Sequence, residues 1–383
     1  MIDRPMCARL VALLSGVFLG LFIVLTGGCE SQPVDTRSTT DYLVSLQEAD
    51  ELEYNIAWQS AVVTTPYGQV SGLYPYYDVV VTTENGRNFI GAVTTRDGTP
   101  VWESSVGDRL ERLLGVVRNG DQLIANTQSD LYVLDIGNGS EVTHQKFGEN
   151  NVASTSPFIL GSLAIYGTPD GRVVYHHMGT GIMAAAYRLD SAITHAPIWL
   201  GDAIAMVTQS GTINVIDPGE NSRIWMNRVR DPLTATPAVD SYAMYVAGRD
   251  QSVWAFRLAD GKMVWRYRAQ YALNDDPKVY DETVYVSIPD YGLVALDHRF
   301  GTEKWVCEEV AGGTVLTRNG QDLIVWDKLD NDRGSTFYRI NGKNGNLEGT
   351  FTTTKIHWAA SDKAEGGDVY GASRRGRMIK LVP

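Results

Sequence analysis

Cysteine is almost absent, since the 383 residues contain only Cys7, Cys29 and Cys307. We expect Cys7 to leave with an N-terminal signal and Cys29 to be lipidated, for reasons given below. Cys307 would then remain alone and could form no intrachain disulfide. Packing must therefore stabilise the fold without help from covalent cross-links.

The sequence also lacks a basic tract. Lys and Arg total 33 against 45 Asp and Glu, so the formal net charge is −12. Binding to nucleic acid requires Lys and Arg to replace the counterions of phosphate. We therefore exclude nucleic acid as a partner.

Proline is sparse, with 14 residues against 38 glycines and 19 tyrosines. This ratio excludes a collagen helix and favours many short strands joined by turns. Hydrophobic residues make up 44% of the chain, which is enough to form a sizeable core.

The one long uncharged apolar run is Leu10–Leu25, which follows Arg4 and Arg9. It has 16 residues, whereas a membrane-spanning helix needs about 20. Three small residues and then Cys29 come next. A basic start, an apolar centre and a small-residue end are typical of a signal peptide.

This segment resembles a bacterial lipoprotein signal, in which the cysteine becomes the acylated first residue of the mature chain. The resemblance implies that residues 1–28 are the signal peptide and that Cys29 is the lipidation site. An ordinary cleaved signal and an uncleaved anchor are the alternatives. Glu30 follows the cysteine, and by the same resemblance this favours an outer-membrane lipoprotein that faces the periplasm.

Residues 29–50 are expected to form the lipidated cysteine and a flexible tether, because 30–40 is polar and has no periodicity. Leu43, Leu46 and Leu52 give residues 41–53 the pattern of a short helix. Residues 51–383 are expected to be the folded domain.

Four prolines recur at a fixed step of 40 residues, and each precedes an apolar strand, a turn and a second apolar strand. They are Pro157, Pro197, Pro237 and Pro277. Self-similarity at a fixed period predicts a repeat fold.

A second repeated phrase places a turn residue four positions before a tryptophan. The turn residues, at steps of 41, 42, 40, 40, 40 and 44, are Gly98, Gly139, Gly181, Asn221, Gly261, Gly301 and Gly345. The tryptophans that follow are Trp102, Trp225, Trp265 and Trp305, whereas Thr143, Ala185 and Gly349 occupy the other three places. We expect these indoles to pack between repeats, and the glycines to supply a positive φ.

Each repeat has about four short segments in which Val, Ile, Tyr and Thr alternate with polar residues, which predicts a four-stranded propeller blade. Trp58 has no strand before it, and residues 376–383 resemble the strand that precedes a Gly–Trp phrase. Joining them completes one more unit and leaves no open edge. The prediction is an all-β, eight-bladed β-propeller of antiparallel blades, closed by pairing of the N- and C-terminal strands.

The phrases GLVALDHRFGTEKW (292–305) and SVWAFRLADGKMVW (252–265) resemble the PQQ-type propeller repeat. With the lipoprotein signal and short tether, the chain is similar to the BamB family of outer-membrane assembly factors. That resemblance implies a non-catalytic scaffold that contacts the β-barrel assembly machine. It places the contact in the stretches 189–197 and 231–237, near Leu189 and Asp231, although the family's arginine and most of its acids are missing there.

Metal and catalytic sites are not expected. His176 and His177 are adjacent on a predicted strand and must point to opposite faces. Asp330-Asn331-Asp332 begins like a calcium loop but lacks the closing glutamate. We find no phosphate loop, nucleophile elbow or paired cysteines, so no cofactor and no enzyme activity are expected.

Three functions remain to be weighed. A scaffold would use the loops of one ring face and exposed strand edges to hold protein partners. A small-molecule-binding or sensory propeller would use the axial funnel. A quinone-dependent dehydrogenase is least favoured, because enzymes of that resemblance carry a vicinal disulfide that this chain cannot form.

Overall fold

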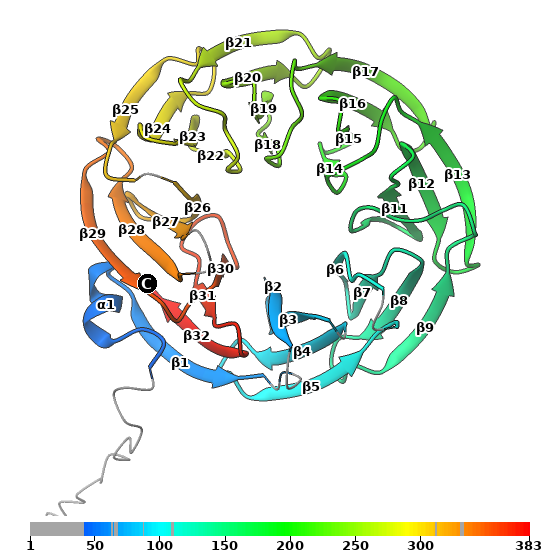
Figure 1. Ribbon diagram of the computed structural model, residues 1–383, viewed down its shortest axis with the longest axis horizontal. Helices are drawn as coiled ribbons and strands as arrows, with labels where there is room; N and C mark the ends of the chain where they lie inside the picture. The colour runs from blue at the N-terminus through cyan, green and yellow to red at the C-terminus, as the bar shows by residue number, and fades with distance from the viewer. Residues whose placement is uncertain are drawn as a thin grey trace, which may run out of the picture. The chain divides into compact units, whose positions relative to one another are not determined.

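The computed structural model describes residues 42–383, apart from 63, 65–67, 87, 109–110, 311 and 330–332. Over this part of the chain, eight four-stranded antiparallel sheets stand side by side around a central axis (Figure 1). Each sheet is one blade, with one end strand nearest the axis and the other on the outside of the ring. The predicted eight-bladed β-propeller is confirmed.

Seven blades are formed by four consecutive strands that run outward from the axis. The first four of these are β2 (Gln69–Pro75), β3 (Val79–Asn85), β4 (Phe89–Thr94) and β5 (Pro100–Ser105); β6 (Gly115–Asn119), β7 (Gln122–Asn126), β8 (Asp130–Asp135) and β9 (Glu141–Lys146); β10 (Phe158–Leu160), β11 (Leu163–Gly167), β12 (Arg172–His177) and β13 (Ile182–Arg188); and β14 (Ile198–Trp199), β15 (Ile204–Val207), β16 (Thr212–Asp217) and β17 (Ser222–Arg228).

The next three blades follow the same plan. They are β18 (Ala238–Val239), β19 (Ala243–Gly248), β20 (Ser252–Arg257) and β21 (Met263–Arg268); β22 (Lys278–Tyr280), β23 (Thr283–Ile288), β24 (Gly292–Asp297) and β25 (Glu303–Cys307); and β26 (Thr314–Asn319), β27 (Asp322–Lys328), β28 (Ser335–Asn341) and β29 (Leu347–Thr353).

The eighth blade joins the two ends of the described chain. Its strands, from the axis outward, are β30 (Trp358–Ser361), β31 (Val369–Ala372), β32 (Arg377–Val382) and β1 (Asn55–Ala61). β1 pairs antiparallel with β32, with Trp58 opposite Lys380. The ring is therefore closed by backbone hydrogen bonds between the N- and C-terminal strands, as predicted.

The hydrophobic core lies in the seams between blades. One cluster, for example, joins Val79 and Ile90 of one blade to Leu123 and Leu134 of the next. Strands in the middle of a blade, such as β19 and β23, are buried at every position, because both faces of a blade pack against a neighbour. The alternation of buried and exposed residues that we expected throughout is clearest in outer strands such as β29.

The ring has two distinct faces. On the crossover face, each outer strand ends and the chain crosses to the inner strand of the next blade. Hairpins between the second and third strands of a blade lie on this face too, because the crossovers bond to them: the backbone amide of Leu189 donates to Gly171, and that of Val229 donates to Gly211. The hairpin face carries the other two hairpins of each blade.

The first residues of the described chain cover the seam between the β26–β29 blade and the closing blade (Figure 1). Helix α1 (Leu46–Glu51) begins after Ser45, whose side chain forms a capping box with Glu48. Leu43 and Val44, which precede the helix, are only 2% and 0% exposed. The expected tether over 29–50 is therefore corrected, since its part from residue 42 onward is folded onto the ring by burial of these apolar side chains.

Gly349 of β29 makes room for this helix. A Cβ atom on Gly349 would lie 1.9 Å from the backbone oxygen of Glu51. Arg339 donates to the same oxygen from its Nε, at 3.1 Å. The absence of tryptophan at position 349 is thus not a lost contact, because the C-terminal end of α1 occupies the space.

We expect Gly349→Ala to displace α1 and to lower the free energy of unfolding by about 1–3 kcal/mol, the usual cost of overpacking. Urea unfolding followed by circular dichroism would measure the loss. Hydrogen exchange would also show faster exchange in residues 46–51.

Gly219→Ala is the matched control, because a Cβ at Gly219 meets only Asp217 Oδ1, at 3.3 Å. An equal loss of stability in both variants, with α1 still protected from exchange, would contradict the assignment of Gly349 to the helix contact.

Candidate functional site

The five predicted tryptophans of the repeat occupy equivalent places on outer strands. Each is between 7% and 9% exposed. In every case the indole Nε1 donates a hydrogen bond to a backbone oxygen of the following blade, at 2.7–3.0 Å. The pairs are Trp58 with Thr95, Trp102 with Ile136, Trp225 with Leu258, Trp265 with His298 and Trp305 with Gly342.

The turn glycines lie against these indoles. A Cβ placed on the turn glycine would lie 2.4–2.6 Å from the indole of the preceding blade, and φ at these positions is between +66° and +78°. The glycines are Gly98, Gly139, Gly261, Gly301 and Gly345. Two demands, a left-handed backbone and a close indole, therefore apply to the same residue.

Three seams lack the tryptophan, and each has another contact. Where Thr143 replaces it, Gln145 donates to the backbone of Met178 and accepts from or donates to His176 Nε2, at 2.8 Å. Gly181, which has φ of +72°, lies against this Gln145. Where Ala185 replaces tryptophan, the Asn221 amide donates to the oxygen of Ala186 at 3.4 Å. Helix α1 covers the third.

The four repeated prolines have a positional role. Each is buried and directly precedes the innermost strand of a blade, namely β10, β14, β18 or β22. Proline fixes its own φ and favours an extended residue before it, which suits the entry of the chain into that strand. Pro237 and Pro277 also line a small cavity of about 210 Å³ with Lys278 and Tyr280.

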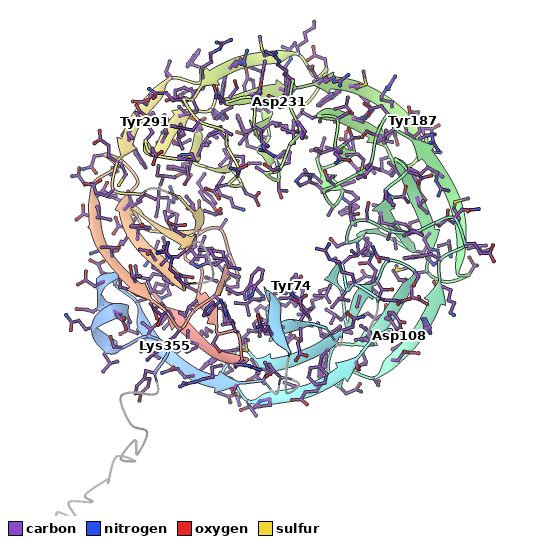
Figure 2. All side chains as sticks on the ribbon, in the orientation of Figure 1. Tyr74, Asp108, Tyr187, Asp231, Tyr291 and Lys355 are labelled. Atoms are coloured by element: carbon purple, nitrogen blue, oxygen red, sulfur yellow. The ribbon has the colours of Figure 1, made fainter. Side chains whose placement is uncertain are left out.

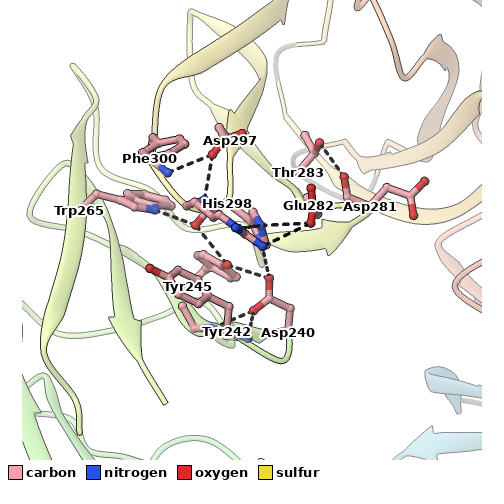
Figure 3. Close-up of polar contacts among 12 residues, drawn as sticks. Asp240, Tyr242, Tyr245, Trp265, Asp281, Glu282, Thr283, Asp297, His298 and Phe300 are labelled. Atoms are coloured by element: carbon pink, nitrogen blue, oxygen red, sulfur yellow. Dashed lines mark hydrogen bonds and ion pairs between the residues drawn. The ribbon is translucent and has the colours of Figure 1, made fainter. Parts of the chain in front are cut away.

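A polar network crosses the seam between the β18–β21 and β22–β25 blades (Figure 3). Asp240 Oδ2 lies 2.7 Å from His298 Nδ1 and accepts a hydrogen bond from the Tyr245 hydroxyl at 2.8 Å. Its other oxygen accepts from the backbone amides of Tyr242 and Ala243. This network surrounds the backbone oxygen of His298 that receives the Trp265 indole N–H.

Burial alone would raise the pKa of Asp240, but hydrogen bonds from His298, the two amides and Tyr245 outweigh it and hold the pKa below its usual range. Burial, together with this carboxylate, raises the pKa of Tyr245. The network thus holds an ionised carboxylate and a neutral phenol at a blade seam. Neither group faces a cavity large enough for substrate, so we assign the network to blade adhesion.

The other histidines also contact protein groups individually. His144 Nε2 is 2.7 Å from Asp130, His177 is 3.2 Å from Ser162, and His195 is 3.2 Å from the oxygen of Thr234. Over the described residues, no group of three or more His, Cys, Asp or Glu side chains is placed to hold a metal ion. The Asp330-Asn331-Asp332 stretch and Cys29 lie outside those residues.

Cys307 is the one cysteine that the structure describes, and its thiol is free and buried. Burial, followed by its contact with Glu309, raises the thiol pKa to about 11. Such a thiol is a poor nucleophile at neutral pH. Across the same described residues, no helix is both long enough and apolar enough to cross a bilayer.

The two stretches that the family resemblance assigned to partner contact differ in exposure. Leu189 is 8% exposed and packs with Ile165 and Ile204, so it is a core residue rather than an exposed contact. Asp190 beside it accepts hydrogen bonds from the hydroxyls of Ser210 and Thr212, both at 2.6 Å. The crossover that contains Asp231 lies over the β18–β21 blade (Figure 2). Sequence reasoning could not separate these cases, because one position decides whether a crossover residue points inward.

Comparison with protein families places almost the whole ring in one group. The family model described as "Outer membrane protein assembly factor BamB" matches residues 86–229 and 209–380.

Curated relatives agree with this match. A protein of that name from Bordetella pertussis is 29% identical over 197 residues, which are 50% of each chain. A second from Burkholderia pseudomallei is 24% identical over 110 residues, which are 29% of each chain. The alignments thus span half or less of these relatives.

Solved structures share the fold. BamB from Moraxella catarrhalis superposes with a TM-score of 0.66 at 16% identity, covering 84% of this chain and 98% of that one. The computationally designed protein Ika8 gives a TM-score of 0.68 at 14% identity, covering 86% and 99%. The C-terminal WD40 domain of Sif2 gives 0.63 at 11% identity, covering 86% and 96%. At these identities the likeness concerns the propeller fold alone.

We expect Gly301→Ala to lower the free energy of unfolding by about 2–4 kcal/mol, because it adds a clash with Trp265 to the cost of a left-handed alanine. Gly120→Ala is the control, since Gly120 has φ of +62° and no atom within 4 Å of a Cβ. The control should lose only about 1–2 kcal/mol. Urea unfolding measures both.

The same pair can be tested as a cycle. In a Trp265→Ala background the clash disappears, so Gly301→Ala should cost no more than the Gly120 control. Additive losses in the double variant would show that the indole and the glycine do not act together.

The Asp240 network predicts a pH-dependent stability. Because the folded pKa of Asp240 lies below its unfolded value of about 3.9, its contribution is complete above that pH and is lost as pH falls through the lowered pKa. We therefore expect Asp240→Asn to remove part of the acid sensitivity of the urea midpoint between about pH 2 and 5. The exposed Asp290→Asn is the control, and identical pH profiles for the Asp240 variant and wild type would refute the prediction.

Proposed function

The chain belongs to the outer membrane protein assembly factor BamB family, and on that premise we propose that it is a non-catalytic scaffold in the assembly of outer-membrane β-barrel proteins. The single observation that carries this proposal is the family match, which runs from residue 86 to residue 380 and so includes most of the closed ring. In this role the protein holds partners through multiple loop contacts and performs no chemistry.

The architecture supports a scaffold. Closure by β1 and β32 and the indole contacts at successive seams make a stiff ring, on which the crossovers are held by bonds to the neighbouring hairpins. A rigid surface loses little conformational entropy when it binds a partner. The crossover face therefore offers a preorganised surface across several blades.

We propose that Cys29 carries the lipid anchor and that the protein faces the periplasm from the outer membrane. The sequence from residue 1 to Cys29 supports this, as does the position at which the described chain begins. Tyr42 lies beside the crossover that precedes β30, since Lys355 Nζ donates to the Tyr42 oxygen at 2.5 Å. Thirteen peptide steps separate Cys29 from Tyr42, a reach of at most about 45 Å.

The proposal predicts a specific pattern of crosslinking in intact cells. A photoreactive amino acid at Gln251 on the crossover face should crosslink to components of the barrel assembly machinery. One at Lys343 on the hairpin face, also exposed, is the matched position. Full-length protein extracted in mild detergent should also copurify with those components. Recovery of the isolated monomer alone, with no crosslinks from either face, would refute the proposed role.

The anchor has its own test. Cys29→Ser should prevent labelling by a radioactive fatty acid and release the protein from the membrane fraction. Retention of label in the variant would contradict lipidation at this residue. Cys307→Ser controls for an effect of losing any cysteine.

A further inference from the structure

Four arginines gather on the crossover face over two neighbouring blades. Arg228 ends β17, Arg268 ends β21, Arg230 lies in the crossover between these blades, and Arg249 lies in the hairpin between β19 and β20. All four residues are exposed. We call this group the arginine patch.

Backbone contacts bring the parts of the patch together. Ala269, next to Arg268, donates its amide to the Gln251 oxygen at 2.9 Å, and so joins the end of β21 to the hairpin that holds Arg249. A Cβ on Gly248 of that hairpin would lie 3.7 Å from the Leu233 side chain of the crossover. The Asp231 label in Figure 2 marks where this crossover runs over the blade. The four arginines are thus neighbours although 40 residues of sequence separate the first from the last.

None of the four guanidinium groups forms an ion pair or a hydrogen bond within the described part of the chain. Their neighbour Arg266 shows the contrast. It lies 4.1 Å from the Trp254 ring, donates to Ser252 at 2.7 Å and pairs with Asp250 at 3.4 Å. Arg266 is therefore held by the fold, whereas the patch arginines are left to solvent or to a partner.

The acids nearest to the patch do not neutralise it. The Asp250 side chain is 3% exposed and already accepts from the Trp254 indole at 3.0 Å. Asp190 is occupied by the hydroxyls of its own hairpin. Asp231 is half-buried in the crossover itself and is the one nearby carboxylate without such contacts. Four cations thus face one available anion.

We propose that the arginine patch binds an acidic surface segment of a protein partner. The inference rests on the proposed scaffold function and deepens it by naming the charge of the partner. A guanidinium presents several donors in a plane and pairs with carboxylates through two hydrogen bonds, so arginine suits such a surface better than lysine. Opposite charge across the contact also speeds encounter and rejects basic or unrelated proteins.

The surroundings favour a protein over a bilayer. Asp275 and Asp276 lie in the next crossover, and Asp290, Glu308 and Glu309 lie further along the same face. These acids, in a chain of net charge −12, would repel an anionic membrane that lay flat on the ring. A protein segment can engage the patch alone, because charges separated by more than about 8 Å are largely screened at physiological salt.

Fluorescence anisotropy gives a direct test with a fluorescein-labelled oligoglutamate peptide as the probe and the full chain as the receptor. The variant changes Arg228, Arg230, Arg249 and Arg268 to Gln. We expect binding by wild type that weakens steeply between about 50 and 200 mM NaCl, and at least about tenfold weaker binding by the variant. The melting temperature should not change, because all four side chains are exposed.

A matched control changes Arg96, Arg223, Lys262 and Lys343 to Gln, which removes the same charge from exposed positions on the hairpin face. It should lower peptide affinity by less than about twofold. Equal losses in both variants, or no binding of peptide by wild type at low salt, would overturn the proposal. Patch-dependent binding to phosphatidylglycerol vesicles but not to the peptide would overturn it in favour of a lipid.

Crosslinking in cells separates this inference from the proposed function. A photoreactive residue at Arg249 should give adducts with an acidic region of an assembly component. If Gln251 and other crossover positions crosslink while neutralising the patch changes nothing, the scaffold role stands and the patch proposal fails. If no crossover position crosslinks, the proposed function itself fails.

Discussion

Every blade of this protein depends on its neighbours for burial. Central strands such as β19 and β23 have no solvent-facing side, so a blade taken alone would expose two apolar faces. The ring satisfies this constraint only when it is closed, and the indole of each outer-strand tryptophan extends the contact to the rim by bonding to the next blade. Closure by β1 and β32 is therefore a condition for the stability of all eight blades, including those far from the termini.

Much of this arrangement could be predicted from spacing alone. Prolines at a step of 40 residues and glycines four positions before tryptophans mark the blade period, because each residue type meets one backbone or packing demand that recurs in every blade. Trp58, left without a strand of its own, indicated where the ring closes. The seams without tryptophan were harder, since nothing in the local sequence shows that Gln145 replaces an indole or that Gly349 accepts a helix. Those contacts join segments far apart in sequence and follow no period.

The surface resists sequence reasoning for a similar reason. The chain is strongly acidic as a whole, yet its arginines at the ends of β17 and β21 lie together because equivalent positions in successive blades share one face. Leu189 illustrates the reverse case, in which a residue in a crossover points into the core. Net charge describes the average of a surface, whereas recognition depends on which blade and which face each charge occupies.

The position of α1 has a mechanical consequence. The helix lies directly after the N-terminal end of the described chain and seals one seam through the Glu51–Gly349 contact. A pulling force applied upstream of Tyr42 would reach α1 first, as shear along a single short helix, before it loaded the ladder between β1 and β32. The ring thus has a mechanical fuse, which yields ahead of the closure that keeps the propeller intact.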